Sequence, residues 1–207
     1  MAPRQAAAPT TNEVATPERR PRADAVRNRA RLLEVATVTF EEQGTDVALE
    51  EIARTAGVGI GTLYRHFQTR EALLEEVFRE RIAGVTALGD ELLEEPDAFE
   101  ALTRWLRAHL SNALACRGLA GAVVIELLDV DDAREDHQPT CTQMRAVGAQ
   151  LLQRAKDEGT ARQDADAEDL VRLVNALVSA TDDADDRGAL ADRLFTLMID
   201  GLRSPTR

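Results

Sequence analysis

The segment Leu49–Phe67, LEEIARTAGVGIGTLYRHF, holds two short amphipathic patterns on either side of Gly57. In both patterns apolar residues recur at the three- and four-residue spacing of a helix face. Gly57 supplies a tight turn, and Val58 is placed to fill the space between the helices. Two short helices joined by such a turn form a helix-turn-helix. The apolar positions that bury the two helices are Leu49, Ile52, Ala53, Ala56, Leu63 and Phe67.

The alternating glycines of residues 57–61 also suggest a loop that cradles phosphate. A nucleotide-binding loop of that kind follows a strand and opens a long helix. Here a short amphipathic helix precedes the glycines, and no segment of the chain has the alternating pattern of a strand. The sequence therefore favours the helix-turn-helix.

The rest of the chain also has helical periodicity, so we expect an all-α fold of about nine helices. The first covers residues 24–43 and ends at Gly44. Thr69 is the expected N-cap of the long helix after the motif. Ala48 occupies the N-cap position of the motif's first helix without a hydroxyl group, which leaves Asp46 as an alternative cap. Further helical segments are expected at about 97–117, 122–128, 141–158, 166–180 and 186–202.

The composition is that of a soluble globular chain, with 207 residues of which 44% are hydrophobic and 30% charged. No apolar run approaches the roughly 18 residues of a membrane span, and no apolar signal region opens the chain. We therefore expect a cytoplasmic protein. Cys116 and Cys141 lie far apart without metal-ligand spacing, so they are expected to be small buried hydrophobes. An oxidation switch formed by this pair is the alternative, and no metal or cofactor is expected.

The net charge of −12 is unevenly distributed along the chain. Residues 1–70 hold ten arginines and nine acidic residues, whereas residues 71–207 hold fifteen basic and twenty-eight acidic residues. The stretch Gly57–Phe67 has no acidic residue. Because an acidic body repels phosphate groups, only the N-terminal part of the chain is suited to approach nucleic acid.

The longer segment Phe40–Phe78, FEEQGTDVALEEIARTAGVGIGTLYRHFQTREALLEEVF, closely resembles the DNA-binding domain of TetR-family transcriptional regulators. The acidic helical remainder is similar in layout to the ligand-binding and dimerisation part of that family. Residues 1–21 are rich in alanine, proline and threonine without a period, so we expect them to form a flexible basic tail. The resemblance implies a helix-turn-helix domain over 22–70 and a ligand-binding and dimerisation domain over 71–207. It also implies a homodimer that binds a pseudo-palindromic double-stranded operator, acts as a repressor and is released by a small-molecule effector.

The resemblance places the second helix of the motif in the major groove of DNA. Ala48 departs from the family's usual serine or threonine, which leaves only its backbone N–H for a phosphate. Arg70 matches a phosphate-binding lysine, and arginines of the N-terminal arm are expected at the DNA backbone or minor groove. A core position for Tyr64 and a purely solubilising role for the arm are the alternatives. The expected DNA contacts are Thr45, Ala48, Gly59, Ile60, Gly61, Thr62, Tyr64, His66, Arg70, Arg19, Arg20 and Arg22.

The effector candidates are polar residues embedded in apolar helical stretches, together with apolar residues that could line a cavity. Glu126 is the most specific of these candidates, because a carboxylate within AVVIELL either faces solvent or contacts a cationic or hydroxylated ligand. For each polar candidate, a solvated or satisfied structural residue is the alternative. An aromatic content of 3% disfavours a cage for flat cationic drugs. The candidates are Phe78, Trp105, His109, Asn112, Glu126, Leu127, Gln143, Met144, Asn175 and Leu177.

The last two predicted helices carry leucines that favour a four-helix interface between two copies of the chain. Closure of the monomer core is the alternative. The interface candidates are Leu170, Leu173, Val174, Leu177, Leu190, Leu194, Leu197 and Met198.

Nothing in the sequence supports an enzyme. The three histidines, at positions 66, 109 and 137, form no cluster with cysteines, and the chain has neither a G-x-S-x-G nor a Walker sequence. The sequence predicts a DNA-binding regulator. Whether such a regulator represses or activates transcription depends on the position of its operator, so an activator is the alternative to a repressor.

Overall fold

The computed structural model describes residues 19–117, 139–181 and 184–204 of the chain. Within these ranges it contains eight helices and no strand, and a single antiparallel bridge pair joins Ala161 and Arg203. The all-α prediction is therefore confirmed. The helices are α1 (Arg19–Gln43), α2 (Leu49–Thr55), α3 (Ile60–His66), α4 (Arg70–Leu92), α5 (Ala98–Arg117), α7 (Pro139–Asp157), α8 (Ala167–Ala180) and α9 (Arg187–Leu202).

Two boundaries differ from the sequence prediction. Helix α1 begins at Arg19, so residues 19–21 continue that helix and do not belong to the tail in which the sequence placed them. Helix α7 begins at Pro139, two residues before the expected start at about 141, because proline fits the first position of a helix. The apolar segment at 122–128 lies outside the described residues, and it accounts for the ninth expected helix.

Local signals set most of the other helix boundaries. Gly44 and Gly159, with φ of +84° and +71°, follow the ends of α1 and α7 in a conformation that glycine adopts without strain. The Thr69 hydroxyl caps α4 by accepting a hydrogen bond of 3.1 Å from the Ala72 N–H. At α2 the N-cap is Ala48, and no side chain caps the helix, so the alternative cap at Asp46 is wrong. Helices α8 and α9 have aspartate caps, Asp166 and Asp186.

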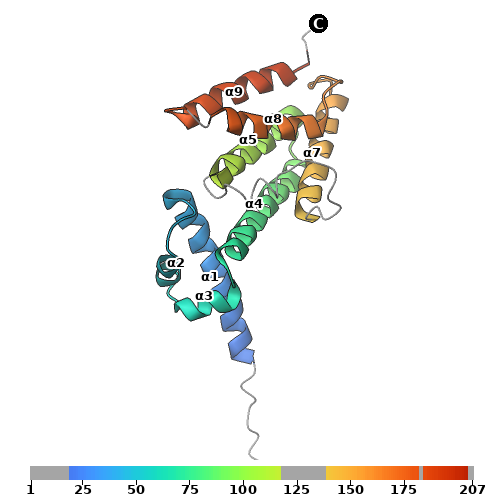
Figure 1. Cartoon of the computed structure of the whole chain (residues 1–207). Coiled ribbons are helices and arrows are strands. Elements are labelled where there is room, and N and C mark those ends of the chain that lie inside the picture. The colour runs from blue at the N-terminus through green and yellow to red at the C-terminus, as the bar shows by residue number, and fades with distance from the viewer. Residues whose placement is uncertain (1–18, 118–138, 182–183, 205–207) are drawn as a thin grey trace, which may run out of the picture.

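Helices α1, α2 and α3 pack together with the start of α4 into a small head, seen at the lower end of Figure 1. Helix α3 is anchored in this head by Leu63 and by Phe67, which follows it, and both side chains are buried. Arg29 of α1 pairs with Glu76 of α4 at 2.7 Å, and its guanidinium lies 5.4 Å from the centre of the Phe67 ring. This cation–π contact and ion pair hold the end of α3 between α1 and α4.

Trp105 of α5 fills the centre of the body, where α4, α5 and α7 meet. Two buried glycines make room for its ring. A Cβ atom added at Gly148 of α7 would overlap the ring, and one at Gly89 of α4 would overlap both the ring and Val147. Glycine at these positions therefore lets the two helix backbones approach the indole closely.

Replacement of Gly148 by alanine is expected to destabilise the chain by about 1–3 kcal/mol, because the added methyl group overpacks the Trp105 site. Gly84→Ala is the matched control, since a Cβ at the exposed Gly84 of α4 meets no atom within 4 Å. Urea denaturation of both variants measures the free energy of unfolding. Equal stability of the two variants would contradict the packing described for Trp105.

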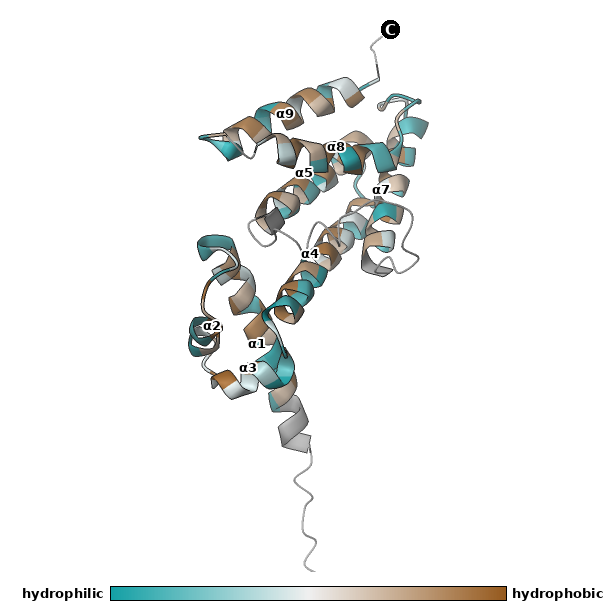
Figure 2. Cartoon of the chain, in the orientation of Figure 1, coloured by the Kyte–Doolittle hydropathy of each residue, from teal (hydrophilic) through white to brown (hydrophobic). Residues whose placement is uncertain are grey.

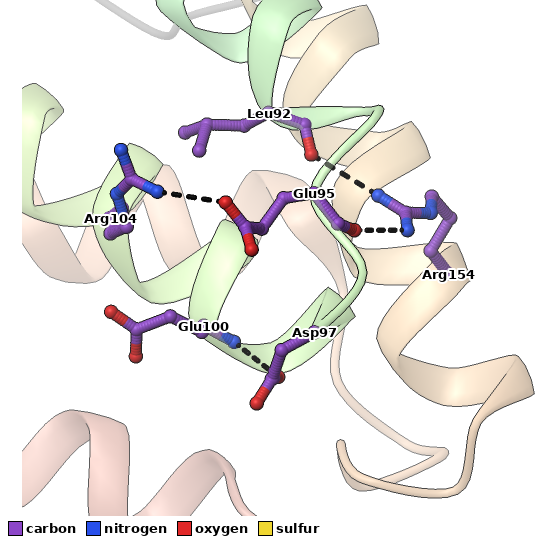
Figure 3. Close-up of polar contacts among 6 residues, drawn as sticks. All are labelled: Leu92, Glu95, Asp97, Glu100, Arg104 and Arg154. Carbon is purple, nitrogen blue, oxygen red and sulfur yellow. Dashed lines mark hydrogen bonds and ion pairs between the residues drawn. The ribbon is translucent and has the colours of Figure 1, made fainter.

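The turn between α4 and α5 is fixed by polar contacts to α7, shown in Figure 3. The Arg154 guanidinium of α7 donates to the carbonyl oxygens of Leu92 and Glu95, at 3.2 and 2.7 Å. The Asp97 carboxylate accepts from the Glu100 N–H at 2.9 Å and so caps α5. The Arg154 contacts hold the turn between α4 and α5 against α7.

Helix α8 packs on α5 and α7, and α9 packs on α8. The chain then returns to the loop before α8, where the Ser204 N–H donates to the Thr160 carbonyl at 2.9 Å. Figure 2 shows apolar residues along α8 and α9 at the end of the molecule opposite the head. None of the described helices combines the length and the apolarity needed to cross a membrane.

Candidate nucleic-acid interface and effector region

Helix α3 turns one face to the core of the head and the other to solvent. Gly61, Tyr64 and Arg65, spaced three and four residues apart, are exposed on the same side of the helix. Tyr64 is 46% exposed, which excludes the alternative of a core aromatic. Figure 1 shows α3 at the end of the molecule where α1 begins, far from α8 and α9.

The turn before α3 depends on Gly57, which has φ of +69° in the left-handed region that favours glycine. The side chain of Arg31 from α1 lies over this turn, since a Cβ atom on Gly57 would be 3.6 Å from its Nη2 atom. Val58 is half-buried against the core, in keeping with its predicted position between the helices. Arg31 itself is exposed, so the turn carries a cation on its surface.

The fold gives no reason for glycine at positions 59 and 61. Gly59 is the N-cap of α3 with φ of −73°, and a Cβ atom built at either glycine meets nothing within 4 Å. At Gly61, inside the helix, glycine lowers helix stability by about 0.5–1 kcal/mol relative to alanine. The two glycines leave bare backbone at the start of α3, beside the exposed Tyr64.

Arg70 at the start of α4 has a structural role that the resemblance did not predict. Its Nη1 atom donates to the carbonyl oxygens of Thr45 and Val47, at 2.5 and 2.7 Å. These contacts order the loop between α1 and α2, which also carries Ala48. The expectation that Arg70 holds a phosphate stays a prediction, because Nη1 alone makes these two backbone contacts.

The remaining predicted DNA contacts lie on α3 and at the start of α1. Ile60, Thr62 and His66 are half-buried, and Ile60 packs against the core of the head. Arg19, Arg20 and Arg22 belong to the first turns of α1, and their side chains lie outside the described set.

Arg65 was missed as a site residue by the sequence reasoning. It is exposed beside Tyr64, and the described part of the chain offers it no ion pair. The signal was available, because Arg65 is the only formal charge in the acid-free stretch Gly57–Phe67.

In the body, three of the effector candidates form one stripe of α5. Trp105, His109 and Asn112 follow helical spacing and are all buried. The rings of Trp105 and His109 stack with centroids 6.0 Å apart. Within the described residues, neither nitrogen of His109 has a hydrogen-bond partner, nor does Nε1 of Trp105. Burial lowers the pKa of His109 to about 4, so its ring is neutral at pH 7.

The other effector candidates are not gathered on this stripe. Phe78 and Met144 are core residues of α4 and α7, while Gln143 is exposed and so does not line an interior cavity. Asn175 and Leu177 of α8 are half-buried, and the Oδ1 atom of Asn175 has no partner among the described residues. Glu126 and Leu127 lie outside the described residues.

The interface candidates on α8 and α9 fall into three groups by burial. Leu170 and Val174 are buried inside the protomer, which corrects the expectation that they contact a second copy. Leu173 and Leu197 are 47% and 68% exposed. Leu177, Leu190, Leu194 and Met198 are half-buried. A surface of exposed and half-exposed leucines therefore remains at the end of the molecule opposite the head.

The oxidation switch finds little support at Cys141. This cysteine is half-buried on α7, and burial raises the pKa of its thiol, although nearby Arg145 lowers it. A raised pKa reduces the thiolate fraction that reacts with oxidants. The side chain of Cys116 lies outside the described set.

Two family models match the chain. One, described as "Bacterial regulatory proteins, tetR family", matches residues 32–77. The other, described as "Transcriptional regulator SbtR-like, C-terminal domain", matches residues 97–204. Together they cover the head and most of the body.

Solved structures with the same arrangement include a TetR transcriptional regulator from Streptomyces coelicolor, at 34% identity and a TM-score of 0.68, covering 86% of this chain and 99% of that one. A TetR regulator from Mycobacterium vanbaalenii matches at 36% identity and a TM-score of 0.62, over 88% and 99%. An HTH-type transcriptional regulator of Staphylococcus aureus is 43% identical over 53 residues, which are 25% of this chain and 29% of that protein. The chain thus spans less than a third of the length of the curated relatives it matches.

Proposed function

Because the chain belongs to the TetR family of transcriptional regulators, we propose that it is a homodimeric repressor that binds a pseudo-palindromic operator and is released by a small molecule. The observation that carries the DNA-binding part is the exposed face of α3. Gly61, Tyr64 and Arg65 share this face, and no acidic residue interrupts it. A short helix whose exposed face is neutral or basic is suited to the major groove.

The glycines at the start of α3 let the helix backbone come close to the base edges. With few long side chains there, base recognition rests on Ile60 and Thr62 and on the shape of the DNA. We expect Tyr64 and Arg65 to contact the phosphate backbone, and the side chain of Arg31 lies over the turn that precedes α3. Because the body carries most of the negative charge, it keeps the rest of the surface away from phosphates.

Two copies are expected to meet through α8 and α9. The exposed Leu173 and Leu197 support this, since a helix pair that leaves leucines in water is suited to pack against its symmetry mate. A pair of heads held at fixed separation reads two half-sites about one helical turn of DNA, or a multiple of it, apart. Dimerisation at the opposite end of the molecule leaves both α3 helices free.

Release is expected to follow from a small molecule bound in the body. The unused hydrogen-bonding groups of Trp105 and His109 support a ligand-responsive body. A ligand shifts the equilibrium only by its difference in affinity between the operator-bound and free conformations. Because α4 belongs to both parts, it is the element through which such a shift reaches the head.

Replacement of Tyr64 by alanine tests the assigned face. Loss of this side chain is expected to weaken binding to an operator duplex about five- to tenfold, or about 1–1.4 kcal/mol. Stability should change by no more than about 0.5 kcal/mol, because the side chain is exposed. Fluorescence anisotropy with labelled duplex gives the affinity, and a thermal melt gives the stability.

Val38→Ala is the control for this experiment, because Val38 is similarly exposed at 48% but lies on α1 outside the assigned face. It should bind the operator as the native chain does. Equal affinity of the Tyr64 variant and the control would remove Tyr64 from the interface.

A further inference from the structure

Arg81, in the middle of α4, contacts both the head and the body. Arg81 forms an ion pair through Nη2 with the Glu41 carboxylate of α1, and its Nε atom donates to Asn112 Oδ1 of α5 at 3.2 Å. Its side chain is only 16% exposed, against 36% for Glu41. The remaining nitrogen, Nη1, is buried and has no hydrogen-bond partner among the described residues. A buried guanidinium N–H without an acceptor is costly, and an additional anionic oxygen would satisfy it.

A hollow of about 330 Å³ lies beside this arginine, between α4 and α5. Its size falls in the lower range for small-molecule sites, about 300–1,000 Å³. Arg81, Asn112 and Ser111 bring a cation, an amide and a hydroxyl to its lining. The rest of the lining is apolar or bare, from Gly84, Val85, Leu88 and Ala108. On α4 the lining runs from Arg81 to Leu88, seven residues or about 10 Å along the helix axis.

We propose that this hollow binds a small carboxylate with a short apolar chain, and that the bound carboxylate displaces Glu41 from Arg81. The guanidinium fork suits a carboxylate, and the apolar lining suits a chain extending along α4 towards Leu88. An uncharged amide analogue accepts a hydrogen bond from Arg81 through its carbonyl oxygen but lacks the charge and the second oxygen of a carboxylate, so it gains less.

Displacement of Glu41 is the consequence of a shared partner. A ligand carboxylate that binds the guanidinium through both Nη1 and Nη2 takes Nη2 from Glu41, and two carboxylates side by side repel each other. Loss of the ion pair frees the C-terminal part of α1 from α4, and the head is then no longer held in one orientation on the body. This last step rests on the proposed function, because it assigns the effect of the ligand to operator binding.

Binding is tested without DNA, using sodium octanoate and uncharged octanamide as probes in calorimetry and thermal melts of the full chain. Octanoate is expected to bind the native chain and raise its melting temperature, and octanamide to bind at least tenfold more weakly. Gly84→Leu fills the hollow without touching the Arg81–Glu41 pair, so it should abolish octanoate binding. Glu41→Gln removes the competing charge, so it should tighten octanoate binding at least fivefold.

Equal binding of octanoate and octanamide would overturn the proposal, and so would octanoate binding that survives Gly84→Leu. Unchanged or weaker binding in Glu41→Gln would show that Glu41 and the ligand do not compete. Arg81→Gln should lose octanoate binding; if that variant does not fold, the Gly84 and Glu41 variants decide.

A second arm adds an operator duplex. Octanoate is expected to weaken operator binding by the native chain and not by Gly84→Leu. Octanoate binding without an effect on the operator would overturn the release step alone. Failure of the native chain to bind any duplex would instead sink the proposed function and leave the carboxylate site standing.

Discussion

Replacement of Gly61 by leucine is expected to lower operator affinity at least tenfold, a loss of about 1.4 kcal/mol or more. The leucine side chain would stand on the exposed face of α3 and keep the helix backbone from the base edges. The folded chain should not suffer, because a Cβ atom at Gly61 meets no atom within 4 Å. Leucine is also a better helix former than glycine, so the melting temperature should be equal or higher. Fluorescence anisotropy with labelled operator measures the affinity, and a thermal melt measures the stability.

Gly84→Leu is the matched control for this variant. Gly84 is also an exposed helical glycine with open space around its Cβ position, but it lies on α4, away from α3. Both leucine variants should be as stable as the native chain, and only the Gly61 variant should lose the operator. A Gly61 variant that binds like its control would show that α3 does not approach DNA closely. A Gly61 variant that unfolds would show instead that this glycine serves the fold.

Acid is expected to destabilise the native chain through His109. Because burial lowers the pKa of His109 to about 4, against an ordinary value of 6.5, the unfolded chain takes up a proton before the folded chain does. The stability from keeping this ring neutral is fully present above pH 6.5 and is lost progressively as pH falls towards 4. Over the 1.5 units from pH 6.5 to 5, the loss is about 2 kcal/mol.

His109→Leu isolates this contribution. Leucine has no proton to take up and no buried nitrogen without a partner, so at pH 7 the variant should be at least as stable as the native chain. Urea denaturation at pH 7, 6 and 5 should show the native chain losing about 2 kcal/mol more than the variant. Subtracting the variant's loss of stability from the native chain's loss cancels the contribution of the carboxylates, because they titrate in both chains. If the free energy of unfolding fell equally with pH in the two chains, His109 would take up its proton in the folded chain as easily as in the unfolded one.

Local signals made the head predictable from sequence. The spacing of Leu49, Ile52, Leu63 and Phe67 fixes two short helices, and Gly57 fixes the turn between them. The exposure of Tyr64 agrees with the DNA-contacting position that the resemblance implied and does not follow from periodicity, because Tyr64 directly follows the buried Leu63 and the buried Phe67 comes three residues later.

Contacts between distant segments were not predictable in the same way. Nothing near Arg70 in the sequence announces that it binds the carbonyls of Thr45 and Val47, more than twenty residues earlier. The Arg81–Glu41 pair and the role of Gly148 beside Trp105 likewise depend on how helices pack. For α8 and α9, periodicity identified the apolar positions but could not tell which side of α8 faces α5.

Selection from a random pool of duplex DNA by the native 207-residue chain tests whether the exposed face of α3 binds an operator. The proposed function predicts enrichment of one sequence with two inverted half-sites, bound by two protomers, with an affinity that falls steeply as salt rises. Gly61→Leu and Tyr64→Ala should fail to enrich it, while Gly84→Leu should enrich it as the native chain does. No enrichment by the native chain, or the same enrichment by the α3 variants, would contradict an operator-binding role for this face.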